Sequence, residues 1–207
     1  SMHYKNKWIW NNICISDIND MNFEICSGEH CFIIGHHIKD KSILKDAIDR
    51  LVTVGFDYFN IFGEQADLWS EVIITKENQK RQIQVEASKI DRMSMSYNLA
   101  MLATLKPEST NFVISDDEYF TEYLIEDLHD IFSGKSKFTP FDWKKFKDGY
   151  EFIYHKKDSI VSISGDIAIG FLKKEKVFNS IDKAFRYKIF DGKSFNEIWD
   201  EISKTLY

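Results

Sequence analysis

"CFIIGHHIKDKSILKDAIDRLVTVGFDYFNIF", residues 31–62, changes its hydrophobic period twice, and this change decides the fold. The runs at 31–35 and 56–62 are short and apolar, as expected of strands that are buried on both faces. Between them, apolar residues recur at helical spacing at Ile43, Ala47, Leu51 and Val54. Asp40 suits the N-cap of this helix and Gly55 its C-cap. The stretch therefore predicts a strand, a helix and a second strand.

The same alternation continues on both sides of this stretch. It predicts an edge strand at 7–15, helices at 64–76, 86–105 and 116–132, and a third apolar strand at 111–115. Strands that alternate with helices are typical of βαβ units, in which helices cover both faces of a parallel sheet. The predicted fold class is α/β, a three-layer sandwich with a mainly parallel (mixed) sheet and Rossmann-like βα units.

The pattern changes after residue 134. Residues 150–174 contain three short strands separated by turn residues, which predicts an antiparallel β-meander. Residues 193–207 have helical periodicity, and Ser194 with Glu197 forms a capping-box pattern at its start. We therefore expect an α/β core at 2–134, followed at 135–207 by a β-meander and a C-terminal helix packed on the same core.

The composition narrows the class of partner and the compartment. The net charge is −6, and only four basic residues are arginines, which disfavours nucleic acid as a partner. No run approaches the roughly 18 apolar residues that a membrane helix needs, so no membrane partner is expected. Three cysteines without an export signal predict reduced thiols and a cytoplasmic location.

A dense group of cysteines and histidines raises the question of a zinc site. Its members are Cys26, His30, Cys31, His36 and His37. Four zinc ligands must converge on one ion. The predicted strand 31–35 instead separates Cys31 from His36 by roughly 16 Å, at about 3.3 Å per residue. We therefore predict neither a metal nor a cofactor here, and Cys31 is expected to be a small buried residue.

Polar residues follow each of the three predicted parallel strands. They are His36, His37, Glu64, Asp116 and Asp117. Open α/β sheets bind ligands at the carboxyl ends of their strands, so these five residues, which we call the rim, form a candidate ligand site suited to a divalent metal or to acid–base chemistry. A structural explanation competes with this one, because Ser115 and Glu118 fit a capping box and the two aspartates favour the positive end of the helix dipole.

The predicted helix at 116–132 carries an unusual row of carboxylates. Glu118, Glu122, Glu126 and Asp130 recur at every fourth position, and Asp127 adds charge. Like charges at this spacing cost about 0.2–0.5 kcal/mol per pair. The row has three explanations: a solvated face, internal pairing with the basic segment at 135–147 through residues such as Lys144 and Lys145, or a docking face for a basic partner.

The sequence contains no complete catalytic or cofactor fingerprint. We expect a cytoplasmic, non-enzymatic protein-binding protein of bacterial origin, and an immunity or antitoxin-type protein that neutralises a basic toxin is one concrete form. The alternative is a small enzyme or ligand-binding domain that uses the rim. A third possibility is a structural subunit of a larger assembly, with the aromatic N-terminal segment as an interface.

Overall fold

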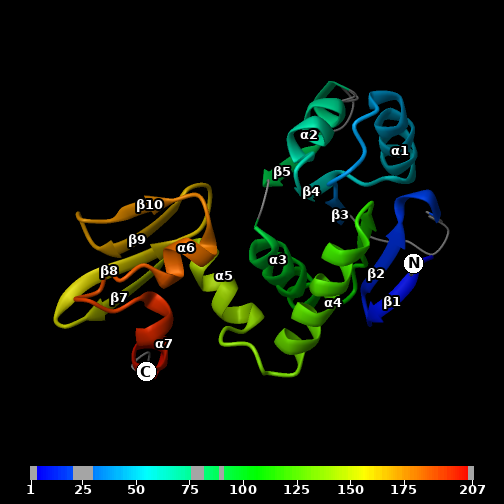
Figure 1. Ribbon diagram of the computed structural model, residues 1–207. Coiled ribbons are helices and arrows are strands. Elements are labelled where there is room, and N and C mark those ends of the chain that lie inside the picture. The colour runs from blue at the N-terminus through cyan, green and yellow to red at the C-terminus, as the bar shows by residue number, and fades with distance from the viewer. Residues whose placement is uncertain (1–3, 21–29, 76–81, 89–90, 205–207) are drawn as a thin grey trace. The chain divides into compact units, whose positions relative to one another are not determined.

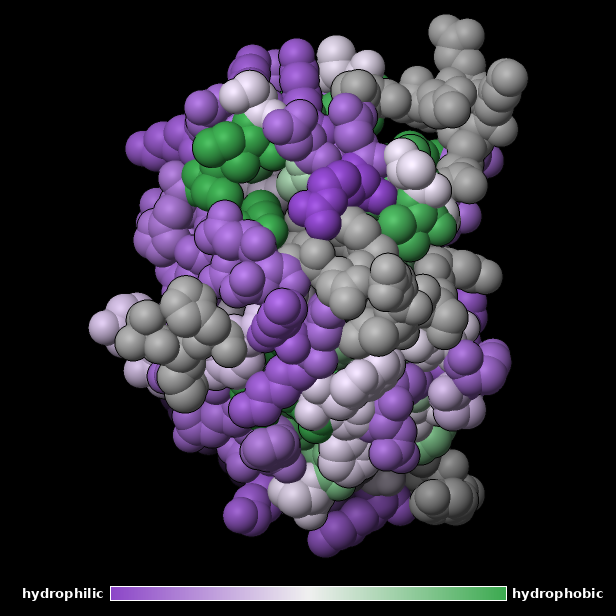
Figure 2. All heavy atoms as spheres, turned by 90° about the vertical axis from the view of Figure 1, so that its right-hand side faces the viewer, coloured by the Kyte–Doolittle hydropathy of each residue, from purple (hydrophilic) through white to green (hydrophobic). Residues whose placement is uncertain are grey.

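The computed structural model describes residues 4–20, 30–75, 82–88 and 91–204 (Figure 1). The chain contacts divide it into two compact units, residues 1–137 and 138–207. Within the described ranges, no helix has the length and apolar character needed to cross a membrane. The face drawn in Figure 2 is mostly hydrophilic, and its hydrophobic side chains lie in small separate patches.

The N-terminal unit is built on one six-stranded sheet with the strand order β1-β2-β6-β3-β4-β5. The strands are β1 Lys7–Trp10, β2 Ile13–Asp17, β3 His30–Ile34, β4 Tyr58–Phe62, β5 Gln84–Ser88 and β6 Asn111–Ser115. All neighbouring strands pair in parallel except β1 and β2. The predicted α/β class with a mainly parallel, mixed sheet is confirmed. β3, β4 and β6 consequently end at the same edge.

Helices cover both faces of this sheet, which gives three layers (Figure 1). The helices α1 Lys41–Val54 and α2 Ala66–Thr75 pack together on one face. Their apolar residues share a core with alternate strand residues such as Ile33 and Ile61. The helices α3 Arg92–Leu105 and α4 Glu118–Phe132 pack together on the other face, and a short 3-10 helix, η1 Ile18–Asp20, follows β2.

Helix α1 has the predicted caps but a different buried face. The Asp40 side chain accepts the Ser42 N–H, and the Gly55 N–H bonds to the carbonyls of the last turn. Ile43 and Val54, which were expected on the apolar stripe, are exposed. The buried residues are Leu44, Ala47, Ile48 and Leu51. The two stripes differ by a small rotation about the helix axis, and contact with the sheet decides between them.

Two predicted elements in the N-terminal unit were wrong. The helix expected at 86–105 begins only at Arg92, because its first residues belong to strand β5. β5 has one neighbour in the sheet and largely exposed side chains, so its sequence lacks the apolar run of a central strand. The single edge strand expected at 7–15 is a hairpin, and its second strand lies inside the sheet beside β6. Asn12 in its turn donates to the Ala103 carbonyl at 3.0 Å.

The C-terminal unit contains an antiparallel sheet with the strand order β10-β9-β8-β7. The strands are β7 Tyr150–Tyr154, β8 Lys157–Ser162, β9 Ile167–Phe171 and β10 Lys176–Phe178. The predicted meander and C-terminal helix are confirmed. The structure adds β10 and two helices, α5 Pro140–Asp148 and α6 Ile181–Arg186, to the final helix α7 Phe195–Ser203. Ser194 and Glu197 form the expected capping box of α7.

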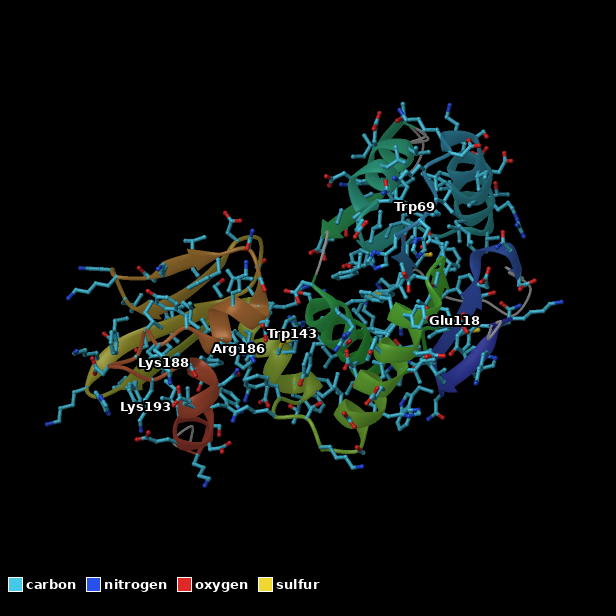
Figure 3. All side chains as sticks on the ribbon, in the orientation of Figure 1. Trp69, Glu118, Trp143, Arg186, Lys188 and Lys193 are labelled. Carbon is cyan, nitrogen blue, oxygen red and sulfur yellow. The ribbon has the colours of Figure 1, made fainter. Side chains whose placement is uncertain are left out.

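This unit has its own aromatic core. Phe146 packs edge-on against Phe195 and Trp199, with ring centroids 5.4 and 5.2 Å apart, and Phe185 lies 4.9 Å from Phe195. Trp143 of α5 is also fully buried (Figure 3). Edge-on ring pairs stabilise a core beyond the burial of their area. The expected packing of residues 135–207 on the core of the α/β part stays a prediction.

The ends of β3 and β4 approach each other so closely that a glycine is required there. Gly63 has φ +127°, and a Cβ on it would lie 2.2 Å from the Gly35 carbonyl oxygen. We predict that Gly63→Ala lowers the free energy of unfolding by about 3 kcal/mol or more, because both the backbone conformation and the contact oppose the new methyl group. Urea unfolding followed by circular dichroism measures the change.

Gly134→Ala is the matched control. Gly134 also has a positive φ, +78°, but nothing lies within 4 Å of the position that a Cβ would occupy there. Gly134→Ala should lower the free energy of unfolding by only about 1 kcal/mol, the cost of the left-handed backbone alone. Equal losses at the two positions would contradict the close approach of the strand ends.

Candidate functional site

The rim residues predicted from the sequence lie together in the structure. β3 pairs in parallel with both β4 and β6, and the Asp116 N–H donates to the Ile34 carbonyl at 3.1 Å. The loops that follow the three strands therefore meet at one edge of the sheet. This juxtaposition was predicted and is confirmed, whereas a role of the rim in binding or catalysis stays a prediction.

The Asp116 carboxylate joins β6 to the loop after β3. It accepts three consecutive backbone N–H groups, from His36 at 2.8 Å, His37 at 3.0 Å and Ile38 at 2.9 Å. Successive N–H groups that converge in this way form an anion-binding concavity. The anion in this concavity is a side chain of the protein itself, so Asp116 has a structural task at the position where α/β proteins commonly bind ligands.

Asp117 connects the rim to the start of α4. One carboxylate oxygen accepts the Phe120 N–H at 2.8 Å and caps the helix, and the other lies 2.8 Å from His37 Nε2. The predicted capping box of Ser115 and Glu118 was wrong, because the helix begins at Glu118 and its N-cap is therefore Asp117. The Ser115 hydroxyl instead accepts the Asp117 N–H at 3.0 Å.

His36 and Glu64 meet through the backbone of Glu64. The Glu64 N–H donates to His36 Nδ1 at 3.2 Å, and the imidazole packs against the Phe120 ring with centroids 5.1 Å apart. The contact fixes the tautomer of His36, since Nδ1 is the acceptor and the proton belongs to Nε2. Asp116, Asp117 and the two histidines thus join three loops and one helix, while Glu64 contributes its backbone N–H.

Trp69 of α2, labelled in Figure 3, lies against Gly35, next to His36 of the rim, and was not expected to contribute to the rim. Its side chain is fully buried between α2 and the sheet, and a Cβ on Gly35 would lie 2.5 Å from its indole nitrogen. Gly35 is therefore needed for the close passage of the chain over the indole ring. The sequence signal was only the position of Gly35 at the end of an apolar strand.

The cysteines give no support for a metal site. In the part of the chain that the structure describes, no group of three or more histidine, cysteine, aspartate and glutamate side chains is placed to hold an ion. Cys14 and Cys31 are buried in strands of the sheet. Burial raises the pKa of the Cys14 thiol to about 11, which disfavours the thiolate that binds metals. Cys26 lies outside the described residues.

The five acidic residues predicted for docking differ in their surroundings on α4. Glu122 and Glu126 are exposed, whereas Glu118, labelled in Figure 3, and Asp130 are half-buried. Asp127 faces α3, where it accepts bonds at 2.9 Å from both Arg92 Nε and the Ser96 hydroxyl. The exposed centre of the acidic row is therefore the pair Glu122 and Glu126.

Two exposed tyrosines flank this pair and were missed by the sequence reasoning. Tyr119 is 76% exposed and Tyr123 is 52% exposed. The Arg92 guanidinium lies over the Tyr123 ring, 4.9 Å from its centroid. The available signal was their spacing, because Tyr119, Glu122, Tyr123 and Glu126 fall on one face of a 3.6-residue helix.

Two of the basic residues proposed to pair with this row, Lys144 and Lys145, have partners in their own helix. Lys144 Nζ bonds to Asp148 at 2.7 Å, and Lys145 Nζ lies 4.0 Å from Asp142. All four residues belong to α5. The suggested internal pairing of the acidic row therefore gains no support from the described contacts of these lysines.

Comparison of the sequence with models of protein families found no match. Comparison with curated proteins found no similar sequence.

We predict that Asp116→Asn destabilises the N-terminal unit by roughly 2 kcal/mol or more. A carboxamide cannot accept all three N–H groups, because its nitrogen is itself a donor, and the lost bonds are charge-assisted. Denaturant unfolding monitored by circular dichroism measures the loss. The control Asp46→Asn changes the same charge on an exposed position of α1 and should have little effect. Similar stability of the two variants would contradict the structural role of Asp116.

Proposed function

We propose that the chain is a non-enzymatic protein-binding protein that docks a basic partner on the exposed face of α4. We call this face, made of Tyr119, Glu122, Tyr123 and Glu126, the docking face. The observation that carries the proposal is that Glu122 and Glu126 are exposed, four residues apart, and make no ion pair within the described residues. Like charges at this spacing cost stability, and a cationic partner would relieve that cost.

The local and overall charge supports the same proposal. Burial and then the negative charges of Glu122 and Glu118 raise the pKa of the Tyr4 hydroxyl, as expected beside a negative surface. Residues 1–137 contain 14 basic and 22 acidic residues, a net charge of −8. A field of this sign attracts basic proteins and speeds their encounter with the unit.

The tyrosines give the docking face a second means of recognition. Tyrosine supplies a large contact area at a small cost in side-chain entropy, and its ring attracts cations. Arg92 already shows this mode inside the chain, because its guanidinium contacts both the Tyr123 ring and Asp127. A basic partner that presents arginine or lysine would find the same two chemical groups at Tyr119 and Glu122.

In one concrete form, this protein would act in a bacterial cytoplasm as an immunity or antitoxin-type protein and neutralise a basic toxin by stoichiometric binding. An acidic inhibitor surface suits such a role, since charge complementarity gives fast association and partner selection. The rim as a ligand site remains the alternative function. It has weaker support, because Asp116 and Asp117 already hold backbone N–H groups with their carboxylates.

The double reversal Glu122→Lys with Glu126→Lys tests the docking face. A partner is first isolated from the native host with the wild-type chain and identified by mass spectrometry. We then expect the reversal to slow association with this partner by about tenfold or more at low salt while the fold survives, because attraction becomes repulsion. Surface plasmon resonance at several salt concentrations measures the association rate.

The matched control is Asp46→Lys with Glu108→Lys, which makes the same change in net charge at exposed positions away from α4. Its association rate should stay close to that of the wild type. An unchanged rate in the α4 reversal, or an equal fall in both variants, would end the proposal in favour of a merely solvated acidic face.

A further inference from the structure

Three turns of the C-terminal unit meet at one end of its sheet. The Leu172 N–H, in the turn after β9, donates to the Asp158 carbonyl at the start of β8, at 2.8 Å. The third turn, which contains Asp191, lies between α6 and α7. His155, in the turn between β7 and β8, has its Nδ1 2.9 Å from an Asp191 carboxylate oxygen. Four lysines belong to these turns, and a fifth is the first residue of β8. We call the five the lysine-rich end: Lys156, Lys157, Lys173, Lys174 and Lys193 (Figure 3 labels Lys193).

The lysine-rich end has an excess of positive charge. The same turns and the start of β8 contain Asp158, Glu175 and Asp191, three carboxylates against five lysines. Lys157 Nζ lies 3.5 Å from Asp191. The other four lysines are exposed and form no ion pair within the described residues. Residues 138–207 as a whole contain 13 basic and 11 acidic residues, a net charge of +2, so this unit is opposite in sign to the N-terminal one.

Two of these lysines occupy backbone conformations that lysine disfavours. Lys156 has φ +62° and Lys173 has φ +71°. Glycine and asparagine adopt this left-handed region at lower cost and are the usual residues in such turns. The turns would therefore be more stable with other residues, and the presence of lysine points to a use for its side chain.

Exposed aliphatic side chains lie beside the lysines. Ile153 of β7 pairs with Asp158 of β8, and Leu172, in the turn after β9, donates its N–H to the Asp158 carbonyl. Ile153 is 67% exposed and Leu172 is 37% exposed. The three turns contain no arginine and no exposed tryptophan, tyrosine or phenylalanine. Binding of single-stranded nucleic acid typically uses such aromatic rings and arginines, whereas anionic bilayers attract lysines and accept aliphatic side chains below the headgroups.

We propose that the lysine-rich end binds the surface of anionic phospholipid bilayers. The binding is peripheral and reversible: the lysines contact lipid headgroups, and Ile153 and Leu172 enter the interface between them. This site belongs to the other unit and is independent of the docking face on α4. It departs from the expectation of no membrane partner, since the turns are separated in sequence and come together only in the folded sheet.

The full chain is tested against vesicles that contain phosphatidylserine in phosphatidylcholine, with pure phosphatidylcholine vesicles as the neutral reference. We expect binding to the anionic vesicles alone. The variant Lys156→Asn with Lys173→Asn should bind roughly 10- to 30-fold more weakly, from the contribution of two lysines at an anionic surface. Its melting temperature should equal or exceed that of the wild type, because asparagine favours the left-handed turn. Reduced binding is then not a result of unfolding.

The matched control Lys183→Gln with Lys204→Gln removes the same charge from exposed positions outside the three turns. Its binding should change by no more than about twofold, since screening limits the reach of distant charges. The variant Ile153→Thr with Leu172→Thr should weaken binding while leaving its salt dependence unchanged, because the lysines remain.

The proposal is overturned by any of three results. One is the absence of binding to anionic vesicles at low salt, and another is an equal loss in the control and the turn variants. The third is lysine-dependent binding of a single-stranded oligonucleotide without binding of vesicles, which would assign the lysine-rich end to nucleic acid.

Discussion

The contact on which the carboxyl edge of the sheet depends is the Asp116 carboxylate with three backbone N–H groups. β3 and β6 are distant in sequence, and this side chain joins the loop after one to the end of the other. The same loop carries His36 and His37, which contact the end of β4 and the start of α4. One charged group thus positions the loop that connects the ends of β3, β4 and β6. Because its partners are N–H dipoles, the charge is satisfied without a counterion.

This arrangement separates two properties that coincide in many α/β proteins. The carboxyl edge usually contains both the hydrogen bonds that connect the strand ends and the bound ligand. Here the carboxylates of Asp116 and Asp117 hold the backbone of the edge, and the two surfaces that we propose for binding lie elsewhere. They have opposite signs and belong to different units, the acidic one on α4 and the basic one on the turns of the C-terminal sheet.

The sequence predicted what depends on local periodicity. The buried strands at 30–34, 58–62 and 111–115 lie near their expected positions, and so do the caps Asp40, Gly55 and Ser194. The prediction failed at β5, because a strand with one neighbour in its sheet needs no apolar run. It also failed at the start of α4, because the preceding turn decides which residue is the N-cap. The rim could be predicted as a juxtaposition, because parallel strands end at one edge. Its hydrogen bonds between loops could not, because they run between residues 28 to 80 positions apart.

The attachment of α4 has a consequence for the thermodynamics of any association on its outer side. The helix is capped by Asp117, which His37 contacts, and is fastened to α3 by the bonds from Arg92 and Ser96 to Asp127. These constraints hold the backbone beneath Tyr119 and Glu122 in one orientation before a partner arrives. The ordering entropy of that backbone is therefore lost during folding and not during binding. An interface on this helix would therefore behave as a rigid template, and a partner bound there would supply most of the adjustment.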